Sequence, residues 1–240
     1  MTETIAELYN QRFAQDMDAE PKVAWGNEVV KILLSHRTHR NFLPDPIPIG
    51  LMETLLACAY SAPSKSDLQQ ATILRVIDED KREAIESLIP SMPWIGSAPE
   101  FMVFCGDSSR IRRICERRGK PFANDHLDAF FNATVDSAII MQNLIIAAES
   151  SGLGCCPISV IRNHATRVAE ILQLPEWVFP VAGLCVGYPS ATAYVSVRLP
   201  LALTVHVDTY DHSALDRELD DYDQRRDARY SIPDEKQKYV

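Results

Sequence analysis

A dense group of basic and polar side chains occurs early in the chain, in the run SHRTHRNF from Ser35 to Phe42. It holds two guanidinium groups, two imidazoles and two hydroxyls, although the chain as a whole is acidic. Arginine forms bidentate hydrogen bonds with phosphate oxygens, and a threonine hydroxyl with backbone N–H groups can complete such a shell. The run therefore indicates an anion site, unless its cations only complement the C-terminus of the helix before it.

A second candidate is the polar loop APSKSDLQQ, from Ala62 to Gln70. It places hydroxyls, an ammonium group and amides between a predicted helix and a predicted strand. Such a set of donors and acceptors could hold a polar ligand, but many loops of this composition are simply solvated turns. The loop alone leaves both interpretations open.

Other patterns are incomplete. The glycines of Gly152–Gly154 lack the third glycine of a dinucleotide fingerprint and follow a predicted helix, so they do not indicate a Rossmann site. His36 and His39 are not joined by the carboxylates or cysteines that a metal site would need. His206 and Asp208 alternate on an expected strand, but without a nucleophile in a suitable context they are expected to be a surface pair.

The overall composition limits the class of protein. The chain has 240 residues, 46% of them hydrophobic, so it can bury a sizeable core. Its formal charge of −9 argues against non-specific binding to nucleic acid or to an anionic membrane, since both require positive charge. No run approaches the roughly 18 apolar residues of a membrane span, and the polar N-terminus does not look like a signal peptide.

Six cysteines lie on mostly apolar segments without metal-like spacing. They are expected to be buried free thiols in a reducing compartment, and the adjacent Cys155 and Cys156 are expected to belong to the core rather than to a redox centre. We therefore expect a soluble cytoplasmic protein.

Hydrophobic periodicity and breaker residues predict a helix-rich chain with scattered strands, which favours α+β over a doubly wound sheet. The prolines between residues 43 and 50 exclude a helix there. Helices are expected over residues 3–15, 27–36, 51–59, 79–88, 125–152 and 164–174. Strands are expected over residues 71–78, 100–107, 155–161 and 180–189.

The most apolar helix is expected to begin at an N-cap at Asn124 or Asp125 and to stop at Gly152. Apolar residues cover so much of its circumference that it must be buried, either centrally or between subunits. One approximate stripe consists of Leu127, Phe131, Val135, Met141, Ile145 and Ala148.

In their order along the chain, HRTHRNF, SAPSKSDLQ, EFMVFCGD, ISVIRN, GLCVGYP and RLP resemble the nitroreductase family. The likeness is greatest to its branch of oxygen-insensitive NADPH nitroreductases and flavin reductases, and it covers roughly residues 28 to 210. It implies an FMN-binding, nitroreductase-like α+β fold, with a mostly antiparallel central sheet flanked by helices, in an intertwined homodimer. We expect an N-terminal extension over residues 1–25, the FMN-binding domain over 26–212 and a charged arm over 213–240 that embraces the partner.

The resemblance also implies which residues bind FMN. By this resemblance, the HRTHR element and the arginine of RLP bind the phosphate: His36, Arg37, Thr38, Arg40 and Arg198. The polar loop contacts the flavin ring and ribityl chain: Ser64, Lys65, Ser66 and Gln69. A strand end runs under the flavin in this family and places a backbone N–H near N5. In this chain that strand end corresponds to Pro157, Ile158, Ser159 and Val160.

Four positions depart from the family pattern. Val160 stands where glycine allows the backbone to approach the flavin, and Ser196 stands where a lysine often precedes RLP. Met92 replaces a common flavin-contacting glutamine, and Asp67 adds a charge to the loop. FMN binding is expected to survive these departures better than any inference about the preferred electron donor.

The resemblance implies an NAD(P)H-dependent oxidoreductase in which the flavin carries the chemistry, so no catalytic side chain is expected. Hydride would pass from NADPH or NADH through flavin N5 to a small nitroaromatic or quinone-like acceptor in a ping-pong cycle. Two alternatives stay open: a flavin reductase or other dedicated-acceptor enzyme of the same fold, and a flavin-binding protein with little turnover.

Overall fold

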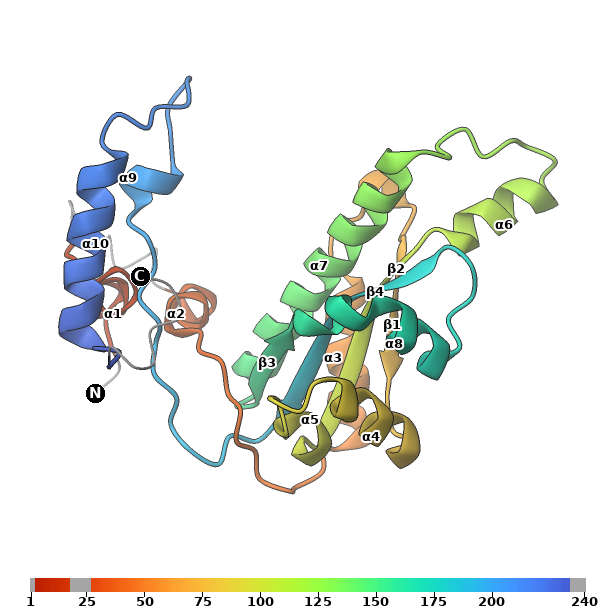
Figure 1. Cartoon of the computed structure of the whole chain (residues 1–240), viewed down its shortest axis with the longest axis horizontal. Coiled ribbons are helices and arrows are strands. Elements are labelled where there is room, and N and C mark those ends of the chain that lie inside the picture. The colour runs from red at the N-terminus through yellow and green to blue at the C-terminus, as the bar shows by residue number, and fades with distance from the viewer. Residues whose placement is uncertain (1–2, 18–26, 234–240) are drawn as a thin grey trace. The chain divides into compact units, whose positions relative to one another are not determined.

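The structure is a computed structural model that describes residues 3–17 and 27–233 (Figure 1). The chain divides into two compact units, which we call the central unit, Thr38–Ala193, and the terminal unit, formed by the segments up to Arg37 and from Tyr194. The predicted N-terminal extension lies partly outside the described residues, and so does the end of the predicted arm, from residue 234.

The central unit is built on one sheet of four strands in the order β1-β2-β4-β3, and all three pairings are antiparallel. This arrangement confirms the predicted α+β class and the mostly antiparallel sheet. The strands β2 and β4 are buried in the middle of the sheet because their residues are apolar on both faces. The bounds are β1 Ala71–Arg75, β2 Glu100–Asp107, β3 Gly154–Ile158 and β4 Val178–Gly187.

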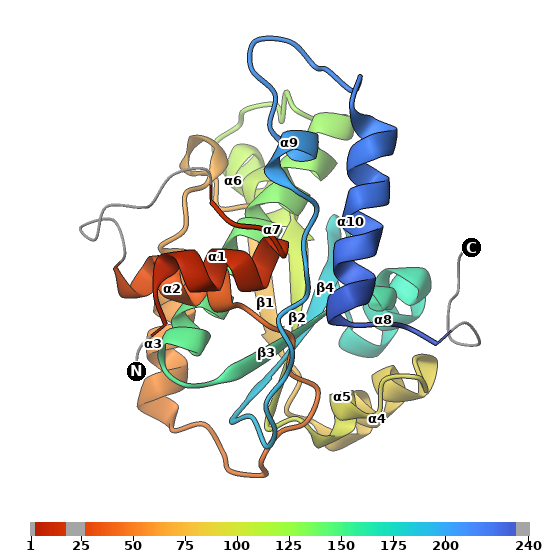
Figure 2. The same ribbon diagram turned by 90° about the vertical axis from the view of Figure 1, so that its left-hand side faces the viewer.

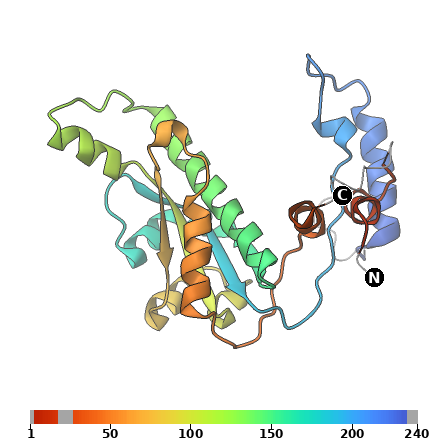
Figure 3. The ribbon, with the colours of Figure 1, turned by 180° about the vertical axis from the view of Figure 1, so that it is seen from behind.

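Helices cover both faces of this sheet. Figure 3 shows α3 and α7 side by side on one face, where they pack against each other and α7 packs on β2. The short helix α5 and the helices α4 and α8 surround the other core. The bounds are α3 Ile49–Tyr60, α4 Glu79–Leu88, α5 Trp94–Ser97, α6 Ser109–Arg117, α7 Leu127–Ser150 and α8 Ala165–Leu172, with 3-10 turns η2 Lys65–Asp67 and η3 Val160–His164.

Successive residues of β2 supply the two hydrophobic cores in turn, because side chains along a strand point to opposite faces. Met102 and Phe104 belong to the core beneath α3 and α7. Phe101 and Val103 belong to the core beneath α4, α5 and α8. This strand therefore fixes both helical layers relative to the sheet.

The helix α7 differs from its prediction in two ways. Its N-cap is His126, whose side chain accepts a hydrogen bond from the N–H of Asp128, so the predicted caps at Asn124 or Asp125 were wrong. The predicted stripe is also split: its last members, Ile145 and Ala148, are buried, whereas Leu127 and Phe131 are exposed. Its stop is as predicted, since Gly152, just past the helix, adopts a positive φ of 77°.

In its first half, α7 turns small and polar residues toward the sheet and α3. Its buried positions there are Ala129, Asn132, Ala133, Asp136 and Ser137. Among the described residues it is the one helix long and apolar enough to cross a membrane by length and composition. Its C-terminal half packs into the core through Leu144, Ile145 and Ala148.

The terminal unit contains the helices α1 Ile5–Phe13, α2 Glu28–Ser35, α9 Leu201–Thr204 and α10 Leu215–Arg229. Within it, α1 packs on α2, and α9 contacts α10 (Figure 2). The expected strand through His206 and Asp208 is absent from this described segment, where α9 is followed by bends and Asp208 has a positive φ of 62°. His206 instead lies against the ring of Tyr210, at a centroid distance of 4.4 Å.

Candidate functional site

The cation-rich run is anchored to the edge strand of the sheet. Thr38 forms a parallel bridge with Cys155 of β3, and the His39 N–H donates to the Cys155 carbonyl at 2.9 Å. Close packing fixes this contact, because a Cβ added at Gly154 would lie 2.7 Å from the His39 ring. The structure therefore brings Thr38 and the residues after it to the start of β3.

Arg40 is exposed at this edge. Its guanidinium carbon lies 5.6 Å from the centroid of the Trp94 ring, a cation–π distance that orients the side chain. The charge reaches the beginning of β3: burial raises the pKa of the Cys156 thiol, and Arg40 partly offsets that rise. A fixed, exposed arginine beside a strand edge suits an anionic ligand.

The predicted flavin platform continues from the same strand. β3 is an edge strand of the sheet, so beyond the Thr38 bridge no other strand of the described residues pairs with its side opposite β4. Pro157 and Ser159 are exposed there, whereas Ile158 is buried. Val160, where a glycine was expected, is half-buried and packs against the core beneath α8.

In the terminal unit, the other predicted phosphate residues are held together by Arg12. This arginine is 5% exposed, and its guanidinium donates to the carbonyls of Leu34, at 3.0 Å, and of Ser196, at 2.9 Å, and also to that of His36. The Arg198 N–H donates to the Arg12 carbonyl at 2.8 Å. The structure thus brings the His36–Arg37 segment and Arg198 together within this unit.

Sequence analysis missed Arg12. It lies on a short amphipathic helix, where an arginine is ordinarily predicted to be solvent-exposed. Its role depends on a segment 184 residues later in the chain, and no local pattern reports such a contact.

The predicted flavin loop is fixed by one buried carboxylate, that of Asp136 on α7. Asp136 accepts hydrogen bonds from the Ser64 hydroxyl at 2.8 Å, the Lys65 N–H at 3.1 Å and the Gln70 N–H at 2.9 Å. Within this loop, Lys65, Ser66 and Gln69 are exposed.

The loop and Arg40 lie at opposite ends of β2. The Asp107 N–H, at the C-terminal end of β2, donates to the Gln70 carbonyl at 2.9 Å. Arg40 lies over Trp94, in the helix that leads into the N-terminal end of the same strand. Eight residues of antiparallel strand span about 24 Å. One chain therefore does not bring the loop and Arg40 together.

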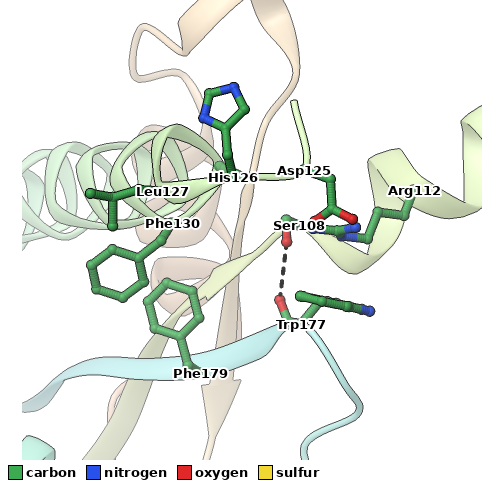
Figure 4. Close-up of a pocket in the computed structure, with 9 residues that line it drawn as sticks. Ser108, Arg112, Asp125, His126, Leu127, Phe130, Trp177 and Phe179 are labelled. Atoms are coloured by element: carbon green, nitrogen blue, oxygen red, sulfur yellow. Dashed lines mark hydrogen bonds and ion pairs between the residues drawn. The ribbon is translucent and has the colours of Figure 1, made fainter. Parts of the chain in front are cut away.

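A separate pocket of about 330 Å³ lies where α6, the start of α7 and the start of β4 meet (Figure 4). It contains none of the predicted site residues. Phe130 and Phe179 stack there with their centroids 4.8 Å apart. Arg112 lies over the Trp177 ring at 3.7 Å and pairs with Asp125 at 2.6 Å, and its hydrogen bond lowers the pKa of that carboxyl.

The cysteines offer no nucleophile at the candidate site. Burial raises the pKa of Cys155 and Cys185, and it raises the pKa of Cys105 to about 12, so these thiols stay protonated at neutral pH. All six cysteines are free, as expected, but only four are buried, since Cys58 is exposed and Cys115 is half-buried. Among the described residues, no cluster of His, Cys, Asp and Glu could hold a metal ion.

The fold is that of a class of flavin-dependent oxidoreductases, to which solved structures with the same architecture belong. The NADPH:FMN oxidoreductase of Vibrio harveyi in complex with NAD+ has a TM-score of 0.80 and 36% identity, covering 85% of this chain and 87% of that one. Nitroreductase A of Vibrio parahaemolyticus has a TM-score of 0.80 and 35% identity, covering 85% and 86%.

The family follows from the sequence comparisons. The nitroreductase family model matches residues 33–188, and the chain belongs to this family. One relative, the FMN reductase [NAD(P)H] of Bacillus subtilis, is 33% identical over 83% of this chain and 81% of its own length. Another, the oxygen-insensitive NADPH nitroreductase of Salmonella typhimurium, is 38% identical over 75% of this chain and 74% of its own length. The resemblance drawn from the motifs is confirmed.

Proposed function

We propose that this chain, an NAD(P)H-dependent FMN oxidoreductase, reduces small nitroaromatic or quinone-like acceptors. The observation that carries the proposal is the anchoring of Thr38 and Arg40 at the start of β3, whose exposed strand end continues from the same point. A hydroxyl and a cation for a phosphate, and an unpaired strand edge for a planar ring, therefore lie along one strand.

The residues present fit FMN. Thr38 and Arg40, preceded in the chain by His36 and Arg37, would hold the phosphate, with Arg198 as the further cation of the terminal unit. Pro157–Val160 would lie beneath the ring, since Pro157 and Ser159 are exposed there. When bound, FMN supplies two-electron transfer from NAD(P)H to an acceptor. The side chains bind and orient, and solvent supplies protons.

We further propose a homodimer in which the Ser64–Gln70 loop of one subunit completes the flavin site of the other. Two observations support it: the loop and Arg40 lie at opposite ends of β2, and the first half of α7 exposes large apolar side chains. Leu127 is 78% exposed and Phe131 is 62% exposed, which is unusual for aromatic and aliphatic residues of a core helix. The FMN-binding domain would span residues 26–212, and the charged arm, 213–240, would contact the partner.

Initial-rate kinetics test the proposed acceptors. With NADPH and then NADH as donor, oxidation of the donor is measured with a nitroaromatic, a quinone and free FMN as acceptor. Parallel double-reciprocal plots with the nitroaromatic or the quinone are the expected result. Slow donor oxidation with every acceptor, by a protein that holds flavin tightly, would favour the flavin-binding alternative instead.

Flavin reduction is the second candidate function. It is favoured by relatives named FMN reductase in Bacillus subtilis and NADPH-flavin oxidoreductase in Vibrio harveyi. A much higher kcat/KM for free FMN than for any nitroaromatic would select it. For either activity we propose a cytoplasmic location, in keeping with six free cysteines.

A further inference from the structure

Asp136 is a buried carboxylate in the middle of α7, with 1% of its surface exposed. A buried charge is costly unless hydrogen bonds satisfy it. Here both oxygens are used: Oδ2 accepts from the Ser64 hydroxyl and the Gln70 N–H, and Oδ1 accepts from the Lys65 N–H. All three donors belong to one loop, so the carboxylate joins the start of that loop to its end.

The loop that Asp136 holds has an unfavourable backbone conformation. Ser66, Asp67 and Gln69 have φ values of 52°, 55° and 50°, in the left-handed region that residues other than glycine rarely adopt. Three such residues in one short loop persist only where the surroundings enforce the conformation. The Ser64 hydroxyl extends the anchor, because it donates to Asp136 and accepts from the Gln69 N–H at 2.8 Å.

We propose that Asp136 is a positioning residue of the flavin site. It holds the Ser64–Gln70 loop in the conformation that presents Lys65, Ser66 and Gln69 to the flavin bound by the partner subunit. The inference rests on the proposed FMN site. Asp136 would not contact the flavin itself. It would position the loop that contacts the flavin ring, whereas Arg40 would bind the phosphate.

The anchor requires a carboxylate. Replacing Asp136 with Asn keeps one acceptor oxygen and turns the other into an NH2 group that faces the loop's donors. At least one donor then loses its partner inside the protein, which is costly. The matched control is Asp128→Asn: Asp128 lies on the same helix, its carboxylate accepts from the Asn132 amide at 2.8 Å, and it acts on the loop only through electrostatic attraction to Lys65.

Hydrogen exchange of the FMN-free protein tests the anchor without any flavin. In Asp136→Asn, the peptide covering residues 61–74 should exchange at least tenfold faster than in wild type, because at least one of its amides loses a buried acceptor and the loop loses part of its anchor. The peptides of β3 and β4 should be unchanged. Asp128→Asn should behave as wild type throughout. Unchanged exchange in the loop of Asp136→Asn would overturn the proposal.

Flavin titration tests positioning. Because the loop faces the ring side, Asp136→Asn should raise the dissociation constants of FMN and of riboflavin by the same factor, about tenfold, at unchanged binding stoichiometry. A lower stoichiometry with unchanged constants would show only a partly folded population and would overturn the proposal. Faster loop exchange with unchanged constants would overturn it as well. If wild type binds neither flavin, the proposed function fails, independently of the exchange result.

Discussion

At Arg40, an exposed guanidinium lies over Trp94 beside the start of β3, and we assign it to the FMN phosphate. Replacing it with Ala removes a charged, bidentate partner, so the dissociation constant for FMN should rise about thirtyfold. Riboflavin, which lacks the phosphate, should bind as it does to wild type. Equilibrium titration of flavin fluorescence measures both constants.

The control for this prediction is Arg167→Ala, which removes an exposed arginine of α8 that pairs with Glu170. It should leave both constants unchanged. If Arg40→Ala keeps wild-type affinity for FMN, the phosphate lies elsewhere and the assignment of the HRTHR element is wrong.

The second prediction for a single residue concerns Arg12. Arg12→Met keeps the apolar stem but removes the donors to the carbonyls of Leu34, His36 and Ser196, so it should lower the free energy of unfolding by about 2 kcal/mol. It should also weaken FMN binding, since the His36–Arg37 segment and Arg198 lose their common support. Urea unfolding measures the free energy of unfolding, and FMN titration measures the dissociation constant. Arg113→Met, at an exposed arginine of α6, is the control and should change neither.

The sequence made the candidate ligand-binding residues visible, but not the residues that hold their segments in place. Thr38 and Arg40 are local in sequence and rich in donors, so their chemistry is visible from composition. Arg12 and Asp136 act through contacts with segments far along the chain, and a buried charge looks like any other charge until the fold places it. That is why both were missed.

Elements with strong local signals were predicted closely. The structure gives β2 and α4 the predicted bounds. The apolar run of β2 is flanked by charged residues, and α4 is a charged helix capped by Asp78, so local sequence marks where each element begins and ends. The short helices α5 and α6 were not predicted. The start of α7 was misplaced by two residues, because a histidine side chain accepts the capping hydrogen bond where aspartate or asparagine was expected.

The exposed apolar stripe on α7 predicts how the subunits associate. Phe131→Asp places a charge in a surface that we expect to be buried between subunits, so it should shift the protein from dimer to monomer. Light scattering across a range of concentrations measures the change. Ile77→Asp, at a position that is 73% exposed outside α7, should leave the dimer intact. A Phe131→Asp protein that stays dimeric would place the interface elsewhere.

At the scale of the whole molecule, a site shared between subunits can be rebuilt from two defective chains. Hybrid dimers of Arg40→Ala and Asp136→Asn contain one site with both native groups and one with neither. At an FMN concentration that fills neither parent dimer, the hybrid should bind one FMN per dimer. If both groups served the flavin of their own chain, each site would carry one defect and the hybrid would bind no better than its parents.

The central claim is that the anchored cations and the open edge of β3 hold a flavin that exchanges electrons with a nicotinamide. The most direct measurement is the absorption spectrum of the purified protein during anaerobic addition of NADPH and then NADH, followed by a nitroaromatic. Bands of oxidised flavin should be present, should bleach with at least one donor, and should return when the acceptor is added. A colourless protein that FMN cannot reconstitute would contradict the account.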